Sequence, residues 1–179
     1  GKPDDLLEDY TKDCLAYLMT CVGHRFGEER SFESLPDGVV LGKDGLNIHF
    51  DAKAYDDGFD VTLDDIRRFA AYVDDFNLRY KDLIGPVYSF VVVSGHWKQK
   101  RAGLENKSNQ LYRFSRTRLS FITAKELGET VNLFRKRPAL RGRVDWKNVF
   151  SLLMVTPRDV QGEIDRVEKD GLSRRHHGD

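Results

Sequence analysis

Residues 36–54 read PDGVVLGKDGLNIHFDAKA, and this stretch decides the fold. From Leu46 to Ala54 apolar and polar residues alternate strictly, which is the pattern of a strand with one face toward the core. Residues 38–41 form a second, shorter apolar run, and the segment between the two runs contains two glycines. The stretch therefore predicts a β-hairpin that turns at residues 42–45.

The register of this hairpin decides whether two acidic residues, Asp37 and Asp51, meet. A two-residue loop would place Asp37 opposite Phe50 and turn the two carboxylates to opposite faces. A three-residue loop that ends at Gly45, with this glycine in the left-handed conformation, would pair Asp37 with Asp51. Their Cβ atoms would then be about 5 Å apart. The sequence leaves both registers open.

In the second register, Asp37 and Asp51 are candidate ligands of a metal ion. Two carboxylates this close repel each other unless a cation lies between them. Mg²⁺ suits the pair because it takes a few carboxylate oxygens, keeps several waters and accepts phosphate oxygens as further ligands. Lys53 shares the strand face of Asp51 and can orient water or offset charge on a phosphate. The three residues are candidate catalytic residues for metal-assisted phosphodiester hydrolysis, although Asp-x-Lys also occurs on merely solvated strands.

Four blocks of sequence resemble the cleavage domains of FokI-like type IIS restriction endonucleases, in the PD-(D/E)XK nuclease superfamily. In order they are PDG (36–38), DAKAY (51–55), YV (72–73) and VVVSGHWK (91–98), and the resemblance covers roughly residues 9–150. It implies an α/β fold with a restriction-endonuclease-like core, a mixed central β-sheet flanked by α-helices.

The same resemblance implies a type II deoxyribonuclease that cuts double-stranded DNA with magnesium. Asp37 and Asp51 would be its metal ligands and Lys53 its catalytic lysine, with Mn²⁺ expected to substitute for Mg²⁺. Whether one or two ions bind per site stays open. A further acidic ligand is usual on the helix before the hairpin, and Glu8, Asp9 and Asp13 are its candidates.

Pairing of two cleavage domains is expected to differ from that of FokI. FokI pairs through an aspartate and an arginine one helical turn later, whereas the corresponding positions hold Arg67 and Ala71. We therefore expect a weak or DNA-induced homodimer.

Charge is unevenly distributed along the chain, although the net charge is +0. Residues 1–93 carry a balance of −9 and residues 94–179 a balance of +9. The basic segment 98–118 can contact DNA phosphates, although a solvated face explains it equally well. His49 shares the predicted face of Asp51 and can reach the substrate, although a surface histidine is the plainer interpretation. The candidate DNA-binding residues are His49, Lys98, Lys100, Arg101, Arg113 and Arg116.

The remaining pattern predicts the other elements. We expect helices at 4–22 and 63–78, a buried strand at 87–93, an irregular basic segment and a short strand at 119–122. Thr62 and Thr123 are predicted to cap the helices that follow them. Two more helices are expected, one at 145–154 and one from Pro157 to Gly171. Residues 1–172 would form a single nuclease domain and residues 173–179 a flexible tail.

Partners and location follow from what the sequence lacks. No signal peptide and no apolar run of membrane-spanning length is found, so we expect a cytoplasmic protein without membrane contact. No helix-turn-helix or zinc finger is found either, so a recognition domain or subunit outside this chain is expected to select the sequence. Two alternatives stay open: a DNA repair or recombination nuclease of the same superfamily, and a catalytically silent DNA-binding or assembly domain.

Overall fold

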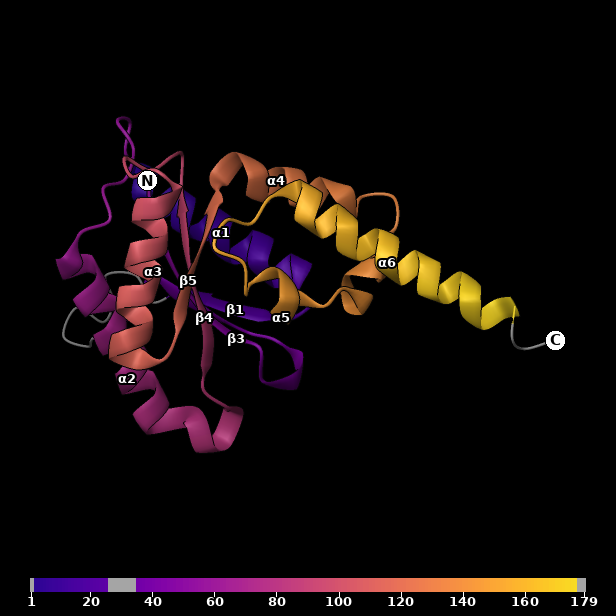
Figure 1. The fold of residues 1–179 in the computed structure, drawn as a ribbon, viewed down its shortest axis with the longest axis horizontal. Coiled ribbons are helices and arrows are strands. Elements are labelled where there is room, and N and C mark those ends of the chain that lie inside the picture. The colour runs from indigo at the N-terminus through magenta and orange to yellow at the C-terminus, as the bar shows by residue number, and fades with distance from the viewer. Residues whose placement is uncertain (1, 26–34, 177–179) are drawn as a thin grey trace.

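The computed structural model describes residues 2–25 and 35–176 and contains one mixed five-stranded sheet (Figure 1). The strand order is β1-β2-β3-β4-β5; β1, β2 and β3 are antiparallel neighbours, and β3, β4 and β5 run parallel. The strands are β1 (Val22–Arg25), β2 (Gly38–Leu41), β3 (Asn47–Lys53), β4 (Val87–Ser94) and β5 (Arg118–Thr123). The mixed sheet with flanking helices confirms the predicted fold class.

Six α-helices and two short 3₁₀ segments accompany the strands in the described ranges. They are α1 (Pro3–Leu18), η2 (Lys43–Gly45), α2 (Leu63–Ile84), α3 (Arg101–Ser115), α4 (Ala124–Leu133), η3 (Pro138–Arg143), α5 (Trp146–Val149) and α6 (Pro157–His176). Among the described residues, no helix is both long enough and apolar enough to span a membrane.

The β2–β3 hairpin adopts the three-residue register. Gly38 pairs with Phe50, and the amide of Gly42 donates to the carbonyl of Leu46 at 2.8 Å. Gly45 takes the expected left-handed conformation with φ 72°, and Asp44 joins it with φ 58°. Aspartate tolerates this region better than most residues. One step beyond the Gly38–Phe50 pair, the register sets Asp37 opposite Asp51.

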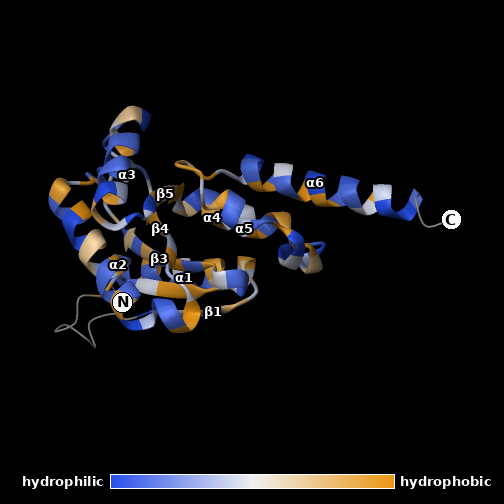
Figure 2. Ribbon diagram, turned by 60° about the horizontal axis from the view of Figure 1, so that its bottom comes forward, coloured by the Kyte–Doolittle hydropathy of each residue, from blue (hydrophilic) through white to orange (hydrophobic). Residues whose placement is uncertain are grey.

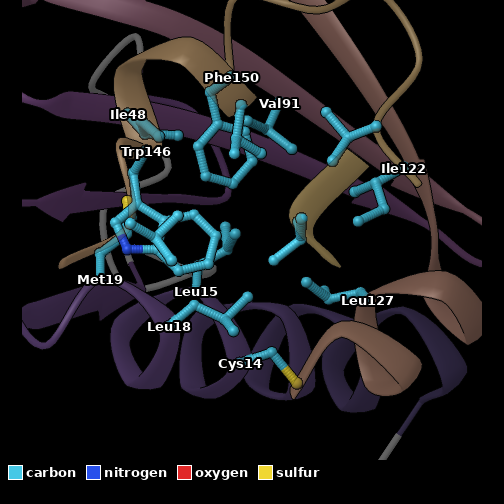
Figure 3. Packing of buried hydrophobic residues seen from close by; sticks show 14 of the residues in the cluster. Cys14, Leu15, Leu18, Met19, Ile48, Val91, Ile122, Leu127, Trp146 and Phe150 are labelled. Atoms are coloured by element: carbon cyan, nitrogen blue, oxygen red, sulfur yellow. The ribbon is translucent and has the colours of Figure 1, made fainter. Parts of the chain in front are cut away.

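Helices cover both faces of the sheet, so each face contributes to its own hydrophobic core. On one face, α1 and α4 pack on the sheet and α6 packs against α4, and Trp146 and Phe150 belong to the same core cluster as Ile48, Val91 and Ile122 of the strands (Figure 3). On the other face, α2 and α3 pack on β4 and β5, and the ring of Phe69 stacks on Phe90 at 4.3 Å. Burial on both faces explains why β4 reads as a continuous apolar run.

The basic segment was expected to be irregular, and this prediction is wrong because residues 101–115 form α3. Its buried stripe alternates leucine with serine: Leu104, Ser108, Leu111 and Ser115. The hydroxyl of Ser108 accepts a hydrogen bond from the Leu119 amide at 3.1 Å, which lets a polar residue sit beneath the helix. The two serines weaken the apolar periodicity on which the prediction depended.

The predicted helix at 145–154 is also wrong, since only α5 forms there. Beyond it, the amide of Phe121 donates to the carbonyl of Leu153 and the amide of Val155 donates to the carbonyl of Phe121. The chain therefore runs beside β5 rather than continuing as a helix. Hydrogen bonding to a neighbouring strand outweighed local helix propensity at this point.

The first two helices end at positions that differ from the predictions. Helix α1 ends at Leu18, and the chain turns through Thr20 into β1, a strand that was not predicted. Helix α2 continues to Ile84.

Helix α6 is longer than predicted, because it passes Gly171 and ends at His176. An interior glycine costs about 1 kcal/mol, which a helix of this length tolerates. Its last turns extend away from the sheet, and the helix is mostly hydrophilic with apolar residues at intervals (Figures 1 and 2). Residues 173–176 of the expected tail belong to this helix, and residues 177–179 lie outside the described part of the chain.

Candidate active site

Three side chains converge at the end of β3, where it adjoins the start of β2. The ammonium nitrogen of Lys53 lies 3.4 Å from Oδ2 of Asp37 and 3.4 Å from Oδ2 of Asp51. Asp51 and Lys53 are two residues apart on one strand, so their side chains share a face. Asp37 meets them because of the hairpin register. The structure thus brings all three predicted catalytic residues together.

Backbone contacts hold this arrangement in place. The amide of Ala52 donates to Oδ2 of Asp37 at 2.8 Å, which orients that carboxylate across the hairpin. The hydroxyl of Ser94 donates to the carbonyl of Lys53 at 2.7 Å and ties the end of β3 to β4. The amide of Ala54 donates to Asp4 of α1 at 2.9 Å. The site is therefore anchored by a neighbouring strand and by the first helix.

In the site, the carboxyl groups of Asp37 and Asp51 share one positive charge, that of Lys53. Burial raises the pKa of Asp51 to about 8, and the nearby charge of Asp37 adds to the increase while Lys53 opposes it. Burial alone would lower the pKa of Lys53, but Asp51 and Asp37 outweigh it and raise this pKa. Without a further cation, the Asp51 carboxyl is protonated at neutral pH.

The residues present fit a divalent metal ion. Oδ2 of Asp51 is buried and accepts no hydrogen bond within the described part of the chain, so the ammonium of Lys53 at 3.4 Å is the cation beside it and the oxygen keeps the capacity to bind a metal ion. Among residues 2–25 and 35–176, no three His, Cys, Asp or Glu side chains form a ready metal cluster. Two carboxylates completed by water and phosphate oxygens suit Mg²⁺, which rarely occupies an all-protein cage.

Comparison with known proteins identifies the family. The model of the FokI cleavage domain matches residues 3–153. The chain belongs to the FokI cleavage-domain family. Two solved structures of restriction endonuclease FokI are similar to it at 18% identity: one with a TM-score of 0.66, and one bound to DNA with a TM-score of 0.65. Both comparisons cover 86% of this chain but 28% of the FokI chain. No curated protein matches.

The family assignment agrees with the fold, which is that of a restriction-type nuclease cleavage domain. At 18% identity, the structural likeness itself supports the fold alone. The chain spans about 28% of the length of the FokI chains it resembles. Helix α6 lies beyond the part matched by the family model.

The first helix of this FokI-type domain offers three acidic candidates, and the structure favours Glu8. Its side chain is 12% exposed, whereas those of Asp9 and Asp13 are 51% and 75% exposed. Burial raises the pKa of Glu8, and the neighbouring charge of Asp37 raises it further. Of these three candidates, Glu8 is therefore the one that borders the site.

Two residues of α2 near the site were not among the candidates from sequence. The charge of Arg68 lowers the pKa of Asp51, and Arg68 forms an ion pair with Asp65 at 2.5 Å. Tyr72 lies one turn further along, and burial raises its pKa while Arg68 opposes the increase. An arginine and a tyrosine at i and i+4 are the only local signal, and that spacing places them on one helix face.

His49 does not lie at the surface, so the expectation that it reaches the substrate is wrong. It is 1% exposed, and its ring packs edge-on against Phe76 at 4.8 Å. Burial lowers its pKa to about 3, so the ring is neutral. The alternation in β3 predicted a solvated face, but α2 covers that face. Asn47 lies on the same covered face, and its side-chain amide donates to the carbonyl of Ile84 at the end of α2.

The predicted DNA-binding residues of the basic segment separate into two groups. Lys98, Lys100 and Arg101 lie where β4 leads into α3; the amide of Lys98 donates to the carbonyl of Phe59, just beyond the end of β3. Arg113 and Arg116 lie at the other end of this 15-residue helix, about 20 Å away along its axis. Lys53 pairs with Ser94 at the end of β4. Lys98, Lys100 and Arg101 follow this end of β4, so they lie at the edge of the sheet that carries the candidate active site.

Proposed function

We propose that this chain is a magnesium-dependent endonuclease domain that hydrolyses phosphodiester bonds of double-stranded DNA. The observation that carries the proposal is the meeting of Asp37, Asp51 and Lys53 at the end of one hairpin, where a buried oxygen of Asp51 accepts no hydrogen bond within the described residues. Membership of the FokI cleavage-domain family supports it. The restriction-type role is thus favoured over repair or recombination.

Asp37 and Asp51 would hold the metal ion, Mg²⁺ or Mn²⁺. When bound, such an ion polarises the scissile phosphate and lowers the pKa of bound water. The carboxylate of Asp37 is already oriented for metal binding, because it accepts a hydrogen bond from the amide of Ala52. Asp51 would give up its proton, since a cation beside it would offset the burial and the charge of Asp37 that raise its pKa. The protein thus provides a pair of acids whose repulsion the ion relieves.

Lys53 would act on the substrate phosphate as a fixed positive charge. Its side chain is 23% exposed and its ammonium group is held between two carboxylates, so it remains protonated. When the ion neutralises the carboxylates, Lys53 becomes available to orient the attacking water or to offset charge developing on the phosphate. Lysine suits this role because its ammonium is a compact point charge.

DNA would approach the edge of the sheet where the site lies. We propose that Lys98, Lys100 and Arg101 contact backbone phosphates there, because they follow β4 directly. Arg113 and Arg116 are at the far end of α3 and are assigned no contact near the site. Sequence recognition would come from a domain or subunit outside this chain. The domain boundary at residue 172 and a cytoplasmic location stay predictions.

A plasmid-nicking assay with and without Mg²⁺ tests the proposal. Asp51→Ala and Lys53→Ala should each reduce cleavage by about 100-fold or more, because each removes charge stabilisation at the phosphate. Asp82→Ala, which changes an exposed aspartate on α2, is the matched control and should cleave at the wild-type rate. Wild-type DNA binding with no cleavage under any divalent ion would instead indicate a silent binding domain.

A further inference from the structure

A second cation, Arg25 of β1, is built into the acidic side of the site. Its Nε lies 2.7 Å from Oε2 of Glu8, and one Nη lies 2.6 Å from Oδ1 of Asp5. The other Nη lies 3.3 Å from Oδ2 of Asp9. The side chains of Arg25 and Glu8 are 22% and 12% exposed, so the contact between them is largely shielded from water, whereas Asp5 and Asp9 are 41% and 51% exposed. One guanidinium therefore serves three carboxylates of α1.

This cluster continues directly into the proposed metal site. Glu8, Arg25 and Asp37 line one cleft of about 310 Å³, together with Asp4 and Asp5. On the far side of Asp37, Lys53 bridges to Asp51. Each of the two cations thus serves its own acids: Lys53 lies between Asp51 and Asp37, and Arg25 pairs with Glu8, which shares the cleft with Asp37.

We infer that Arg25 takes the place and the charge of a second metal ion beside Glu8, so that the site binds one divalent ion, between Asp37 and Asp51. This inference rests on the proposed nuclease function and decides the number of ions. Glu8 accepts from Arg25 and borders the ion without being its main ligand. Arg25 is then a positioning residue, which acts through Glu8 and not on the substrate.

The geometry excludes a second ion in the wild-type chain. An ion bound at Oε2 of Glu8 would have to displace Nε of Arg25 from a contact of 2.7 Å. A guanidinium stays charged at every accessible pH, so it would also repel a divalent ion placed beside it. Asp5 and Asp9 hold its two Nη atoms and oppose its rotation out of the cluster. The oxygen without a hydrogen-bond partner belongs instead to Asp51.

The test counts bound Mn²⁺ per chain from the loss of the free-ion electron paramagnetic resonance signal. The wild type should bind one ion. Arg25→Gln removes the built-in charge and should bind two, whereas Arg25→Lys should keep one. Arg67→Gln is the matched control, because Arg67 makes an exposed ion pair with Asp64 on α2, and it should also bind one. A count of two in the wild type, or of one in folded Arg25→Gln, would overturn the inference.

A second variant keeps the inference testable if Arg25→Gln does not fold, as judged by circular dichroism. Glu8→Gln should still bind one ion, with affinity reduced by no more than about tenfold, the lower end of the loss expected for a partner outside the ligand set. Loss of the ion in folded Glu8→Gln would make Glu8 a main ligand and overturn the inference. A wild type that binds no ion would instead refute the proposed function itself.

Discussion

At the residue scale, Asp51 is the group whose charge depends most on what binds beside it. In the folded chain without metal it holds its proton up to about pH 8, whereas the unfolded chain loses this proton near pH 3.8. The contribution of Asp51 to stability is therefore fully present below pH 3.8 and is lost as the pH rises to about 8. Above that pH, the folded chain contains a buried charge opposite Asp37.

We expect the metal-free wild type to lose stability relative to Asp51→Asn as the pH rises from roughly 5 to roughly 8, by at most ~1.4 kcal/mol per pH unit. The amide does not ionise, so the variant lacks this loss. Urea unfolding with a chelator at each pH measures the difference. Asp82→Asn changes an exposed aspartate and should follow the wild type. Parallel curves for wild type and Asp51→Asn would show that Asp51 does not titrate in this range.

Local spacing predicted the core of the site but not its surroundings. Asp37, Asp51 and Lys53 lie within one hairpin, and a single choice of loop length fixes their meeting. Arg25 and Arg68 reach the site from β1 and α2, through contacts between elements that no local pattern encodes. His49 was misplaced for the same reason: period-2 alternation identifies two faces of a strand but does not show whether a helix covers the polar one.

At the scale of elements, α3 separates the basic residues that the sequence presents as one segment. Its N-terminal end lies at the edge of the sheet that carries the site, and its C-terminal end leads into β5. The guanidinium carbon of Arg118 lies 4.3 Å from the centre of the Tyr112 ring. Part of the positive charge at that far end is therefore engaged by a contact within the protein. The helix thus gives the two ends different surroundings and, in our proposal, different roles.

We expect Lys100→Glu combined with Arg101→Glu to weaken DNA binding for all sequences alike. It should also reduce the slope of log affinity against log salt by about 2, roughly 1 for each phosphate that the protein no longer neutralises. Arg113→Glu combined with Arg116→Glu makes the same change in charge at the other end of α3 and should leave the slope closer to wild type. Fluorescence anisotropy over a salt series, with a chelator to prevent cleavage, measures both. Equal losses of affinity would show that proximity to the site does not decide which residues bind phosphate.

At the scale of the whole molecule, the sequence predicted the layers better than the ends. The hairpin, the buried strand β4 and the capped helix α2 have strong patterns, and they fix a mixed sheet flanked by helices. The prediction failed in the segment after α5, where the carbonyl of Leu153 and the amide of Val155 bond to Phe121 and not within a helix. The hydrophobic periodicity of a segment does not report hydrogen bonds to a distant strand. The helix predicted at 145–154 was wrong for this reason.

Our proposal of a single site also predicts that two copies pair to cut both strands of DNA. The two strands of a duplex run in opposite directions, so one fixed site presents the correct geometry to one strand at a time, and a two-fold pair of domains resolves this. Arg67 is already paired with Asp64 of its own helix at 3.3 Å, and both are exposed, so α2 offers no strong ionic contact to a second copy at this position. The pair should therefore be weak in solution and form on DNA.

We accordingly expect linear plasmid to form more steeply than in proportion to protein concentration, with the nicked form appearing before the linear one. The first cut needs one domain, whereas the second needs a partner whose arrival depends on concentration. Gel quantification of supercoiled, nicked and linear plasmid over a dilution series measures this order, and sedimentation gives the oligomeric state at each concentration. Adding the inactive Asp51→Ala chain separates pairing from catalysis, because it can fill the partner's place but cannot cut. An excess of this inactive chain should make nicked plasmid accumulate and should suppress the linear product. A strictly linear concentration dependence with no nicked intermediate, at concentrations where only monomer sediments, would show that one copy cuts both strands.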